Sequence, residues 1–516
     1  MNEMGGAHVG DPPAGRPARA LAASLAGTGT ATLLQLIFIP VFVNLLGIEA
    51  YGLLGFYVGI FGAAQVLDIG LSPALNRDLA GLASRPGDAQ AARNLVRSIE
   101  TGYLALGALL GLALIALAPW FADGWFHDAE LPRDTILAAF RWMGVLLAVQ
   151  WPISLYQSGL IGLERQVDFN VVNVIAALAA HAGGALLLWS TGPSLPKLIA
   201  WLAAINFLRA AALGVLLWRG LPATPAQPRF EWAQLQRIAP YATGLAIGGA
   251  AGLLLAQLDR FAVGRALPLA DLGRYSLAAN VILGMSQIAI AVYNVVFPRL
   301  SAVREARPRD LAAQFHVTAQ IIGVLVVPIG LVLTVFATDV FTLWTGSAEQ
   351  GAAIGPAAAL LAAGSTLNAL AVAPYALQLA ARWTRASALL SVAQFLLALP
   401  LWWWLPMQYG LPGAAGVWLI VNAVGLIVQA WVTFAHLLPG ERWAWLRSDI
   451  LPTTGAALGA VLFVSFGASW LAPNRVGLAA ALTIAAAAAL ALGAALAASV
   501  YPRRAVAAWL NGRFHA

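Results

Sequence analysis

The sequence predicts an all-α polytopic membrane protein of about fourteen transmembrane helices, and three observations support this. Of the 516 residues, 60% are hydrophobic and only 10% are charged, and the mean hydropathy is +0.79. A soluble globular chain carries about 25% charged residues, so this chain has too little charge to cover a water-facing surface. The other two observations are a series of apolar stretches of membrane-spanning length and an uneven distribution of Arg and Lys between the loops.

Fourteen apolar stretches supply the predicted transmembrane helices. A helix needs about 20 predominantly apolar residues to cross the hydrocarbon core of a bilayer. The residues before the first stretch are polar, are rich in Pro and Gly and lack the apolar segment of a signal peptide, so they predict a disordered cytoplasmic tail. In chain order the predicted spans cover residues 22–45, 51–72, 97–119, 135–158, 169–190, 198–218, 240–262, 275–296, 315–341, 353–378, 386–405, 413–436, 451–471 and 476–500.

The positive charges of the loops support this count independently of hydropathy. With the N-terminus placed in the cytoplasm, the inner loops and tails receive 21 of the 29 Arg and Lys residues and the outer loops receive six. The remaining two, Arg141 and Arg209, fall inside spans. Cytoplasmic loops of membrane proteins carry such an excess of Lys and Arg. The sequence therefore predicts an even number of spans with both termini in the cytoplasm.

A Pro-rich break after the sixth span divides the predicted helices into two lobes. The break lies at Arg219–Ile238, and the six spans after it begin on the same side as the first six. Tyr51 precedes Arg77 by 26 residues in the first half, and Tyr275 precedes Arg299 by 24 in the second. Parallel repeats are a transporter architecture. The predicted organisation is a tail (1–20), a six-helix N-lobe (21–220), a linker (221–237), a six-helix C-lobe (238–438) and a two-helix extension with a cytoplasmic tail (439–516).

Composition excludes several classes of function. The chain has no Cys, which rules out disulfides, thiolate metal sites and Cys nucleophiles. The six His residues never occur in pairs at metal-ligand spacing, so no metal site is expected. The net charge of +7 comes from Arg residues in small groups between apolar runs, not from a continuous basic stripe, so nucleic acid is not an expected partner. The sequence has no nucleotide-binding loop, which argues against ATP as the direct energy source.

Two segments resemble a known family of transporters. Residues 42–80 resemble the opening of polysaccharide-biosynthesis flippases of the O-antigen type, which belong to the multidrug/oligosaccharidyl-lipid/polysaccharide exporter superfamily. Residues 253–301 resemble the seventh and eighth helices of the same family. The matching residues of the first segment are Gly47, Ala50, Tyr51, Gly52, Asp68, Gly70, Leu71 and Arg77. Those of the second segment are Asp259, Arg260, Gly273, Tyr275, Phe297, Pro298 and Arg299.

The resemblance implies a fold and an activity. Family members have two six-helix bundles around a central cavity and move undecaprenyl-pyrophosphate-linked sugars from the cytoplasmic to the periplasmic leaflet by alternating access. The expected function is therefore a flippase for polyprenyl-pyrophosphate-linked oligosaccharide in the bacterial inner (plasma) membrane, serving cell-surface polysaccharide biosynthesis, and not an enzyme. Many O-antigen flippases have twelve spans, whereas fourteen resembles the lipid II flippase branch.

The same resemblance implies the partners. The lipid-linked glycan is the expected substrate, and membrane lipids surround the protein. Glycan polymerase and glycosyltransferases of the same pathway are candidate partners. The oligomeric state is left open by the sequence.

Charged residues deep in the predicted spans are the candidate site residues. A charge at the bilayer centre costs about 2.5–3.5 kcal/mol on insertion scales, so such residues are usually buried in the bundle and often functional. Guanidinium groups bind the oxygens of a lipid pyrophosphate through paired donors. The candidate substrate-binding cations are Arg209, Arg260 and Arg141. The candidate coupling or gating residues are Asp259, His181 and Asp68, with a proton or sodium ion as the candidate coupling ion and no cofactor expected.

Some of these residues have a purely structural interpretation as local pairs. Asp259 and Arg260 lie towards the outer end of the seventh span and would then form an interfacial pair that reaches the periplasmic surface. Asp68 lies towards the inner end of the second span and would pair with Arg77 or cap a helix. The sequence is compatible with both the functional and the structural interpretation.

The other candidates differ in depth. Arg141 lies six residues into the fourth span, from which its long side chain can extend to the surface. His181 lies deep in the fifth span and would otherwise be a hydrogen-bonded packing residue. Arg209 lies about eleven residues into the sixth span, near the midplane at about 1.5 Å per residue, and is the hardest to explain structurally.

The tryptophans gather at predicted span ends. The run Trp402–Trp404 and the pair Trp120 and Trp125 fall at outer ends. Amphipathic rings prefer the headgroup level, which explains this placement. Stacking on a sugar is the alternative role of the Trp run.

Two other functions compete with the flippase. One is a cation-coupled multidrug or small-solute antiporter of the same superfamily, which usually places an acidic residue deep in a lobe. The other is a membrane glycosyltransferase or a polysaccharide ligase or polymerase. Such an enzyme usually needs a sizeable extracytoplasmic loop, whereas the longest outer loop here, around residues 121–133, is short. The deep charges are chiefly Arg and His, which favours an anionic lipid cargo.

Overall fold

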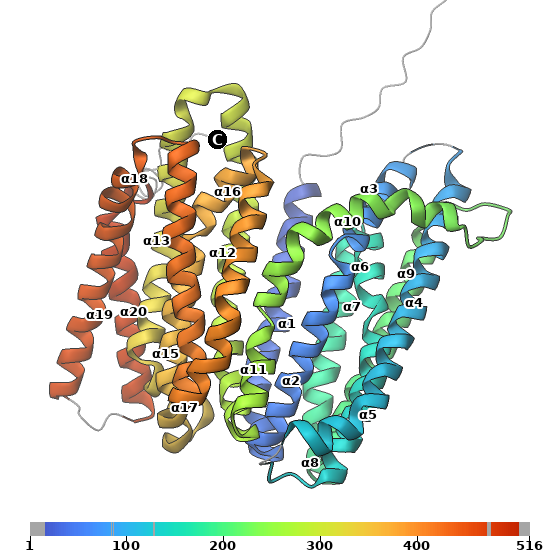
Figure 1. Cartoon of the computed structure of the whole chain (residues 1–516), viewed down its shortest axis with the longest axis horizontal. Coiled ribbons are helices and arrows are strands. Elements are labelled where there is room, and N and C mark those ends of the chain that lie inside the picture. Colours follow the sequence, from blue (N-terminus) through green and yellow to red (C-terminus); the bar gives the residue numbers. More distant parts are fainter. Residues whose placement is uncertain (1–15, 84, 86, 127–128, 472–475, 505–516) are drawn as a thin grey trace, which may run out of the picture. The chain divides into compact units, whose positions relative to one another are not determined.

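The regular structure of the chain is helical. The computed structural model describes residues 16–83, 85, 87–126, 129–471 and 476–504. Within these residues every regular element is a helix and no β-strand is present (Figure 1). Backbone polar groups in hydrocarbon have no water to bond, and an α-helix satisfies them within its own segment. The prediction of an all-α protein is confirmed.

Long apolar helices dominate the described part of the chain. Eleven of its helices are long and apolar enough to cross a membrane. One of them, α17 (Thr384–His436), has 53 residues, more than twice the roughly 20 residues that a bilayer needs. It contains two predicted spans, which meet where the backbone turns at Gly410 (φ 60°, ψ −139°). Glycine adopts such a conformation without the steric cost that a side chain would add.

Two further predicted spans also coincide with helices. The first coincides with α1 (Arg16–Leu46), whose part Thr32–Leu46 is apolar but shorter than the other spans. The seventh coincides with α10 (Trp232–Leu255) and the short α11 (Leu258–Ala266) that follows it. Each of the fourteen predicted spans therefore corresponds to helical backbone, and the multi-pass prediction is confirmed. The predicted disordered tail, residues 1–20, is wrong for residues 16–20, which belong to α1, and residues 1–15 lie outside the described residues.

The backbone contacts divide the chain into two compact units. The first comprises residues up to 41, 68–119 and 134–243. In it, α3 and α9 both pack against α6, and α7 packs against α9. Besides α1 and the start of α10, its helices are α3 (Leu71–Ala83), α4 (Ala89–Trp120), α5 (Arg133–Gln150), α6 (Pro152–Gly162), α7 (Gln166–Leu178), the π-helical turn Ala179–Gly183, α8 (Gly184–Thr191) and α9 (Leu195–Gly220).

The second unit comprises residues 42–67, 120–133 and 244–516. It therefore includes α2, which the sequence places with the first six spans. The division into an N-lobe and a C-lobe at the linker 221–237 stays a prediction. Besides α11 and α17, its helices are α2 (Ile48–Ala64), the π-helical turn Phe121–Trp125, α12 (Leu269–Ala306), the 3-10 turn Pro308–Asp310, α13 (Leu311–Val335), α14 (Ala337–Thr345), α15 (Ala348–Leu370), α16 (Val372–Ala380), α18 (Glu441–Ala444), the π-helical turn Trp445–Ile450, α19 (Leu451–Leu471) and α20 (Leu478–Ala498). A 3-10 turn, Gln65–Asp68, ends the α2 span at the edge of this unit.

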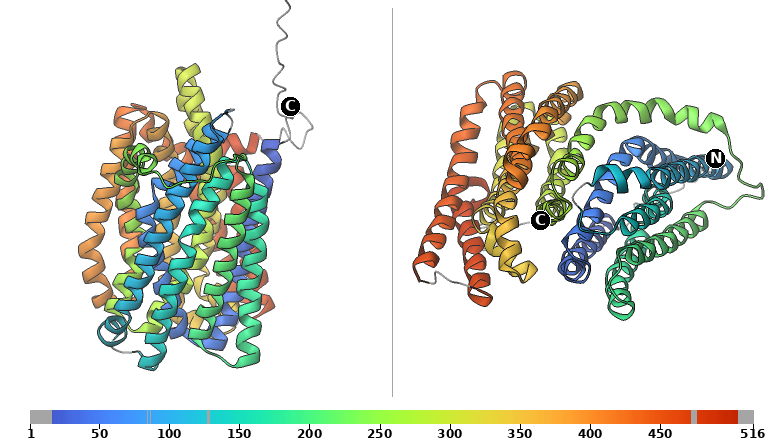
Figure 2. Two further views of the ribbon diagram at one scale, coloured as in Figure 1. Left: turned by 90° about the vertical axis from the view of Figure 1, so that its right-hand side faces the viewer. Right: turned by 60° about the horizontal axis from the view of Figure 1, so that its bottom comes forward.

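The last two helices pack against α13 within the second unit. They are the red helices at the left of Figure 1 and of the right-hand view of Figure 2, and both contact the yellow α13. Asp449 is fully buried and accepts a hydrogen bond from Gln320 Nε2 (2.9 Å), and its other oxygen lies 2.5 Å from Nδ1 of His316. The Oε1 atom of Gln320 accepts a bond from the backbone N–H of Tyr501 (3.0 Å). Buried polar groups, in addition to apolar packing, therefore hold the extension in place.

A row of glycines lets α2 approach its neighbours closely. A Cβ on Gly52 would lie 2.6 Å from the carbonyl oxygen of Leu269 and 2.9 Å from the backbone nitrogen of Gly273. A Cβ on Gly55 would lie 2.6 Å from Cβ of Ser276. In lipid, small residues at helix interfaces gain van der Waals contact that larger ones would prevent. The glycines of α2 therefore set the distance between α2 and α12.

Adding one methyl group at this interface should destabilise the protein. For Gly52→Ala we expect a loss of about 1–3 kcal/mol of stability, because backbone atoms of α12 occupy the position of the new Cβ. Gly102 on α4 is the matched control, since a Cβ there would meet nothing within 4 Å and Ala is the better helix former. Thermal unfolding in detergent should therefore show a lower midpoint for Gly52→Ala and an unchanged or higher one for Gly102→Ala. Equal midpoints for the two variants would contradict the packing.

Candidate functional site

The first turn of α11 carries two of the predicted site residues. The preceding helix ends at Leu255, and the break before Leu258 starts a new helix of nine residues. Asp259 and Arg260 are both buried, with side chains 13% and 9% exposed. Nη1 of Arg260 lies 3.6 Å from Oδ1 of Asp259, and the same oxygen accepts a 2.7 Å bond from the Arg260 backbone N–H. The two charges therefore compensate each other locally.

Two further residues of the second unit lie against this pair. Gln257 Oε1 accepts a long 3.4 Å bond from Arg260 Nη1. On α2, a Cβ at Gly59 would lie 3.1 Å from Cβ of Arg260, so a glycine makes room for the arginine. The structure thus supports a buried, partnered pair over one that extends to the surface. Whether Arg260 binds substrate and Asp259 couples transport stays a prediction.

Arg209 lies on the apolar helix α9 of the first unit. Its side chain is partly buried, and its Nε atom has no hydrogen-bond partner among the described residues. Its sequence neighbours Phe207 and Leu208 are exposed, at 58% and 61%. A buried donor without a partner is costly, so such groups in native structures usually meet water, an ion or a ligand. Arg209 is therefore the candidate cation that its surroundings satisfy least.

His181 lies in a π-helical turn, Ala179–Gly183, between α7 and α8. Its ring stacks against Phe38, with the ring centres 6.3 Å apart. The indole of Trp201 donates a 3.0 Å hydrogen bond to the backbone oxygen of Ala179 at the start of the turn. Single π-helical turns are rare and occur frequently at functional sites. Hydropathy alone does not reveal such a turn.

The remaining two candidates have different environments. Arg141, on α5, is exposed. Asp68 is buried, and its carboxylate accepts hydrogen bonds from the hydroxyls of Ser72 (2.8 Å) and Tyr103. Arg77, the partner expected for Asp68, forms an ion pair with Asp78 at 2.7 Å. Asp68 is thus part of a hydroxyl-lined cluster that the sequence does not predict.

Glu100 is a buried carboxylate that the sequence analysis missed. It is 6% exposed and accepts bonds from the hydroxyl of Tyr156 (3.0 Å) and the indole of Trp218 (3.1 Å). Arg97 forms an ion pair with it at 3.2 Å. Its position three residues inside the predicted span 97–119 is the signal that could have identified it, because intramembrane acids are rare and usually functional.

The chain is similar to known transporters along most of its length. A family model described as polysaccharide biosynthesis protein matches residues 18–303, more than half of the 516. A putative O-antigen transporter from Shigella flexneri is 22% identical over 401 residues, which cover 75% of this chain and 90% of that protein. These matches agree with the resemblance that the sequence motifs indicate.

Two solved structures share the fold. The lipid II flippase MurJ in an inward closed conformation superposes with a TM-score of 0.72 at 12% identity, covering 94% of this chain and 99% of that one. A multidrug resistance MATE family transporter in an inward-facing conformation gives a TM-score of 0.60 at 14% identity, covering 78% and 95%. The similar proteins are named as transporters or flippases and not as enzymes.

The effects of substituting Asp259 and Arg260 on the stability of the protein should depend strongly on each other. For Asp259→Asn and Arg260→Gln, we expect each single change to lower the unfolding midpoint, because each leaves a buried charge without its partner, at a typical cost of about 3–5 kcal/mol. The double variant should lose less than the sum, with a coupling of about 0.5–3 kcal/mol. A double-mutant cycle followed by thermal unfolding measures this coupling.

The exposed pair Glu305 and Arg382 provides the control cycle. Its atoms are 3.2 Å apart, but the side chains are 73% and 86% exposed, so the pair should show no measurable coupling. Additive effects at Asp259 and Arg260 would mean that the two charges are stabilised by other groups.

Proposed function

The chain belongs to the polysaccharide biosynthesis protein family, and we propose that it moves polyprenyl-pyrophosphate-linked oligosaccharide from the cytoplasmic to the periplasmic leaflet of the bacterial inner membrane. The observation that carries this proposal is the family match over residues 18–303 together with the named O-antigen transporter among its relatives. The multi-pass helical fold supports it, since the cargo is a lipid whose sugar must cross the hydrocarbon.

The cargo chemistry agrees with the charges of the first unit. A pyrophosphate needs cationic donors inside the membrane, and an arginine supplies a planar set of N–H groups that matches phosphate oxygens. Arg209 is partly buried on an apolar helix and has an unpartnered Nε among the described residues. In this proposal Arg209 binds the pyrophosphate during translocation. Arg141, which is exposed near the predicted outer end of the fourth span, contacts the headgroup at the periplasmic exit.

Alternating access requires spans that can bend, and several helices are interrupted. One span divides at Trp151, directly before Pro152, and another at Ala371, three residues before Pro374. Pro removes a backbone donor and obstructs the preceding turn, which favours such breaks. The turn at Gly410 comes two residues before Pro412, whereas no proline lies within five residues of the break at Gln257. These interruptions support alternating access as the mode of transport.

A cation-coupled multidrug antiporter is the second candidate, because the first unit holds two buried carboxylates. Asp68 and Glu100 are 8% and 6% exposed. Drug exporters of the superfamily usually couple cation flux to a deep acid, and a MATE transporter shares the fold. Proton or sodium flux that is stimulated by cationic dyes in proteoliposomes would favour this function.

Deletion of the gene distinguishes the two functions in cells. We expect the deletion strain to accumulate the lipid-linked glycan on the cytoplasmic side and to lose the surface polymer, because the polymer is assembled after translocation. Thin-layer or mass-spectrometric analysis of the lipid pool, with immunoblotting of the polymer, measures both. An unchanged lipid-linked pool would overturn the flippase proposal.

Arg209 should determine the transport rate. In the complemented strain, Arg209→Gln should reduce polymer export by about tenfold or more, since hydrogen bonds to charged groups contribute about 1.5–3 kcal/mol. Arg209→Lys should restore export only partly, because an ammonium cannot bind phosphate in a bidentate manner. Arg309→Gln, at an exposed arginine beside α13, is the control and should export normally. Normal export by Arg209→Gln, at equal protein level, would remove Arg209 from the mechanism.

A further inference from the structure

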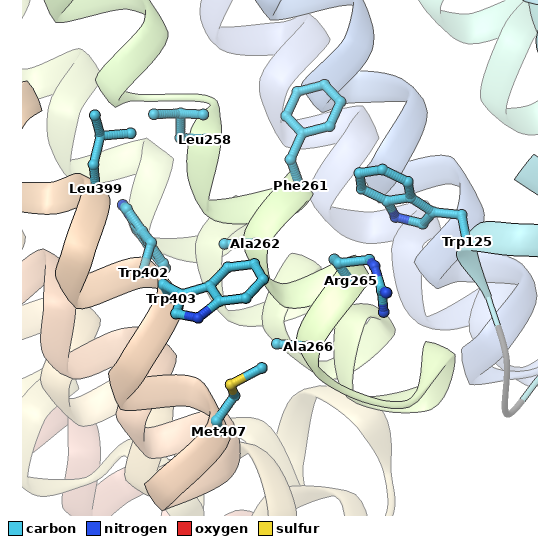
Figure 3. A pocket seen from close by; sticks show the side chains of 10 residues that line it. All are labelled: Trp125, Leu258, Phe261, Ala262, Arg265, Ala266, Leu399, Trp402, Trp403 and Met407. Carbon is cyan, nitrogen blue, oxygen red and sulfur yellow. The ribbon is translucent and has the colours of Figure 1, made fainter.

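The second unit contains two features that the proposed translocation leaves without a role. One is an aromatic cavity of about 410 Å³ between α11, α17 and the π-helical turn Phe121–Trp125 (Figure 3). Arg265 is the one charged residue among the described residues that line it, and the others are aromatic or apolar, so the lining does not select a ligand. The other feature is a cluster of three titratable side chains, His316, Asp449 and Glu441, where α13 meets the C-terminal extension.

Both ring nitrogens of His316 face carboxylate oxygens. Nδ1 lies 2.5 Å from Oδ2 of Asp449, on the π-helical turn Trp445–Ile450, and Nε2 lies 3.2 Å from Oε2 of Glu441, on α18. A carboxylate can only accept hydrogen bonds, and a neutral imidazole has a single N–H. Two bonds therefore need either the protonated ring or a protonated carboxyl group beside the neutral ring. In both forms the cluster holds one proton more than a neutral histidine with two carboxylates.

The burial of Asp449 favours the protonated ring. Asp449 is fully buried, and a carboxylate there is costly unless it is paired and hydrogen-bonded. Its Oδ1 accepts a 2.9 Å bond from Nε2 of Gln320, which is uncharged. Among the described residues no Arg or Lys forms an ion pair with Asp449. The imidazolium of His316 is therefore its cationic partner.

The other charges of the loop point elsewhere. Within the described part of the chain, Asp449 and Glu441 are the titratable groups that form ion pairs with His316. Arg442 and Arg447, which belong to the same loop, lie instead over tryptophan rings, 3.7 and 5.9 Å from the ring centres. A proton gained or lost by the cluster therefore changes its own bonds directly.

These contacts connect both ends of the extension to one helix. Glu441 and Asp449 precede α19, and Gln320, one turn after His316, accepts a bond from the backbone N–H of Tyr501, which follows α20. We propose that the cluster of His316, Asp449 and Glu441 binds a proton and, in that form, attaches the C-terminal extension to α13. In the predicted topology both ends of the extension are cytoplasmic, so the attachment responds to the pH of the cytoplasm. It does not depend on the identity of the cargo.

Loss of the proton should release Glu441 first. A neutral ring keeps one N–H, which stays with the buried Asp449, and turns a lone pair towards the oxygen of Glu441. Two acceptors repel each other, and the Glu441 side chain, which is 36% exposed, can turn to water. Because the attached form holds more protons, raising the pH shifts the equilibrium towards the released form. The loop around α18 should therefore loosen at alkaline pH and stay attached at acidic pH.

Hydrogen exchange of residues 437–450 in the full-length protein in nanodiscs measures the attachment. Comparing variants at the same pH removes the chemical exchange rate from the ratio. At about pH 6, where histidine is readily protonated, His316→Gln should exchange about tenfold faster than the unsubstituted protein, the effect of one hydrogen bond to a charged group. His436→Gln is the control, because Nδ1 of the exposed His436 lies 3.0 Å from a backbone oxygen and not from a carboxylate. Its exchange ratio to the unsubstituted protein should not change with pH.

Glu441→Gln separates the proton from the packing. An amide can accept from an imidazolium or donate to a neutral ring, so its bond to Nε2 of His316 needs no extra proton. At about pH 6 this variant should exchange like the unsubstituted protein. At about pH 9 the unsubstituted protein should exchange about three- to tenfold faster than Glu441→Gln, because only the carboxylate is repelled by the neutral ring. Since Glu441 is partly exposed, this variant should fold even if His316→Gln does not.

Two results would overturn the proposal. One is equal exchange of Glu441→Gln and the unsubstituted protein at both pH values, because the attachment would then not depend on a proton. The other is a loop that becomes better protected in the unsubstituted protein than in Glu441→Gln as the pH rises. The exchange experiment contains no glycan, so its failure would leave the flippase proposal intact, and a normal lipid-linked pool in the deletion strain would leave the proton site intact.

Discussion

The structure depends on one constraint: a backbone that crosses hydrocarbon must satisfy its own polar groups. Helices meet this constraint within each segment, and irregular backbone needs a partner from elsewhere. The π-helical turn at Ala179–Gly183 shows how a partner is supplied, because the indole of Trp201 donates to the carbonyl of Ala179. Interruptions of the spans are therefore supported by specific hydrogen bonds. They occur close to two candidate site residues, His181 in one unit and Asp259 in the other.

A charge buried in the hydrocarbon is costly, so each one indicates either a partner within the protein or a functional role. Asp259, Glu100 and Asp449 are each buried and each have donors within reach, so their charges are compensated inside their own unit. Arg209 differs: Nη1 of Arg260 contacts Asp259 and Gln257, whereas the Arg209 side chain has no hydrogen bond or ion pair among the described residues. A transporter needs both kinds of group. Paired charges hold the helices together, and a cation left without a partner can bind the anionic part of a passing substrate.

Much of the fold could be predicted from the sequence, because hydropathy and loop charge report directly on the membrane. Every predicted span coincides with helical backbone, and the family resemblance at residues 42–80 and 253–301 lies within the region that the family model matches. Hydropathy does not report on contacts between helices. For this reason the assignment of α2 to the second unit, which depends on the close approach at Gly52, could not be predicted. The partners of Asp68 and Glu100, which come from other helices, could not be predicted either. The position of a charged residue within a predicted span identifies it as a candidate. Its partners come from other parts of the chain and are visible only in the structure.

Transport of a lipid-linked oligosaccharide by the purified protein tests the central claim most directly. The protein would be reconstituted into liposomes whose polyprenyl-pyrophosphate oligosaccharide is labelled in both leaflets, and an impermeant glycosidase added outside would report the sugar that reaches the outer leaflet. The account predicts that cleavage proceeds beyond the outer-leaflet fraction in the presence of the protein. Cleavage that stops at the same fraction as in protein-free liposomes would contradict it.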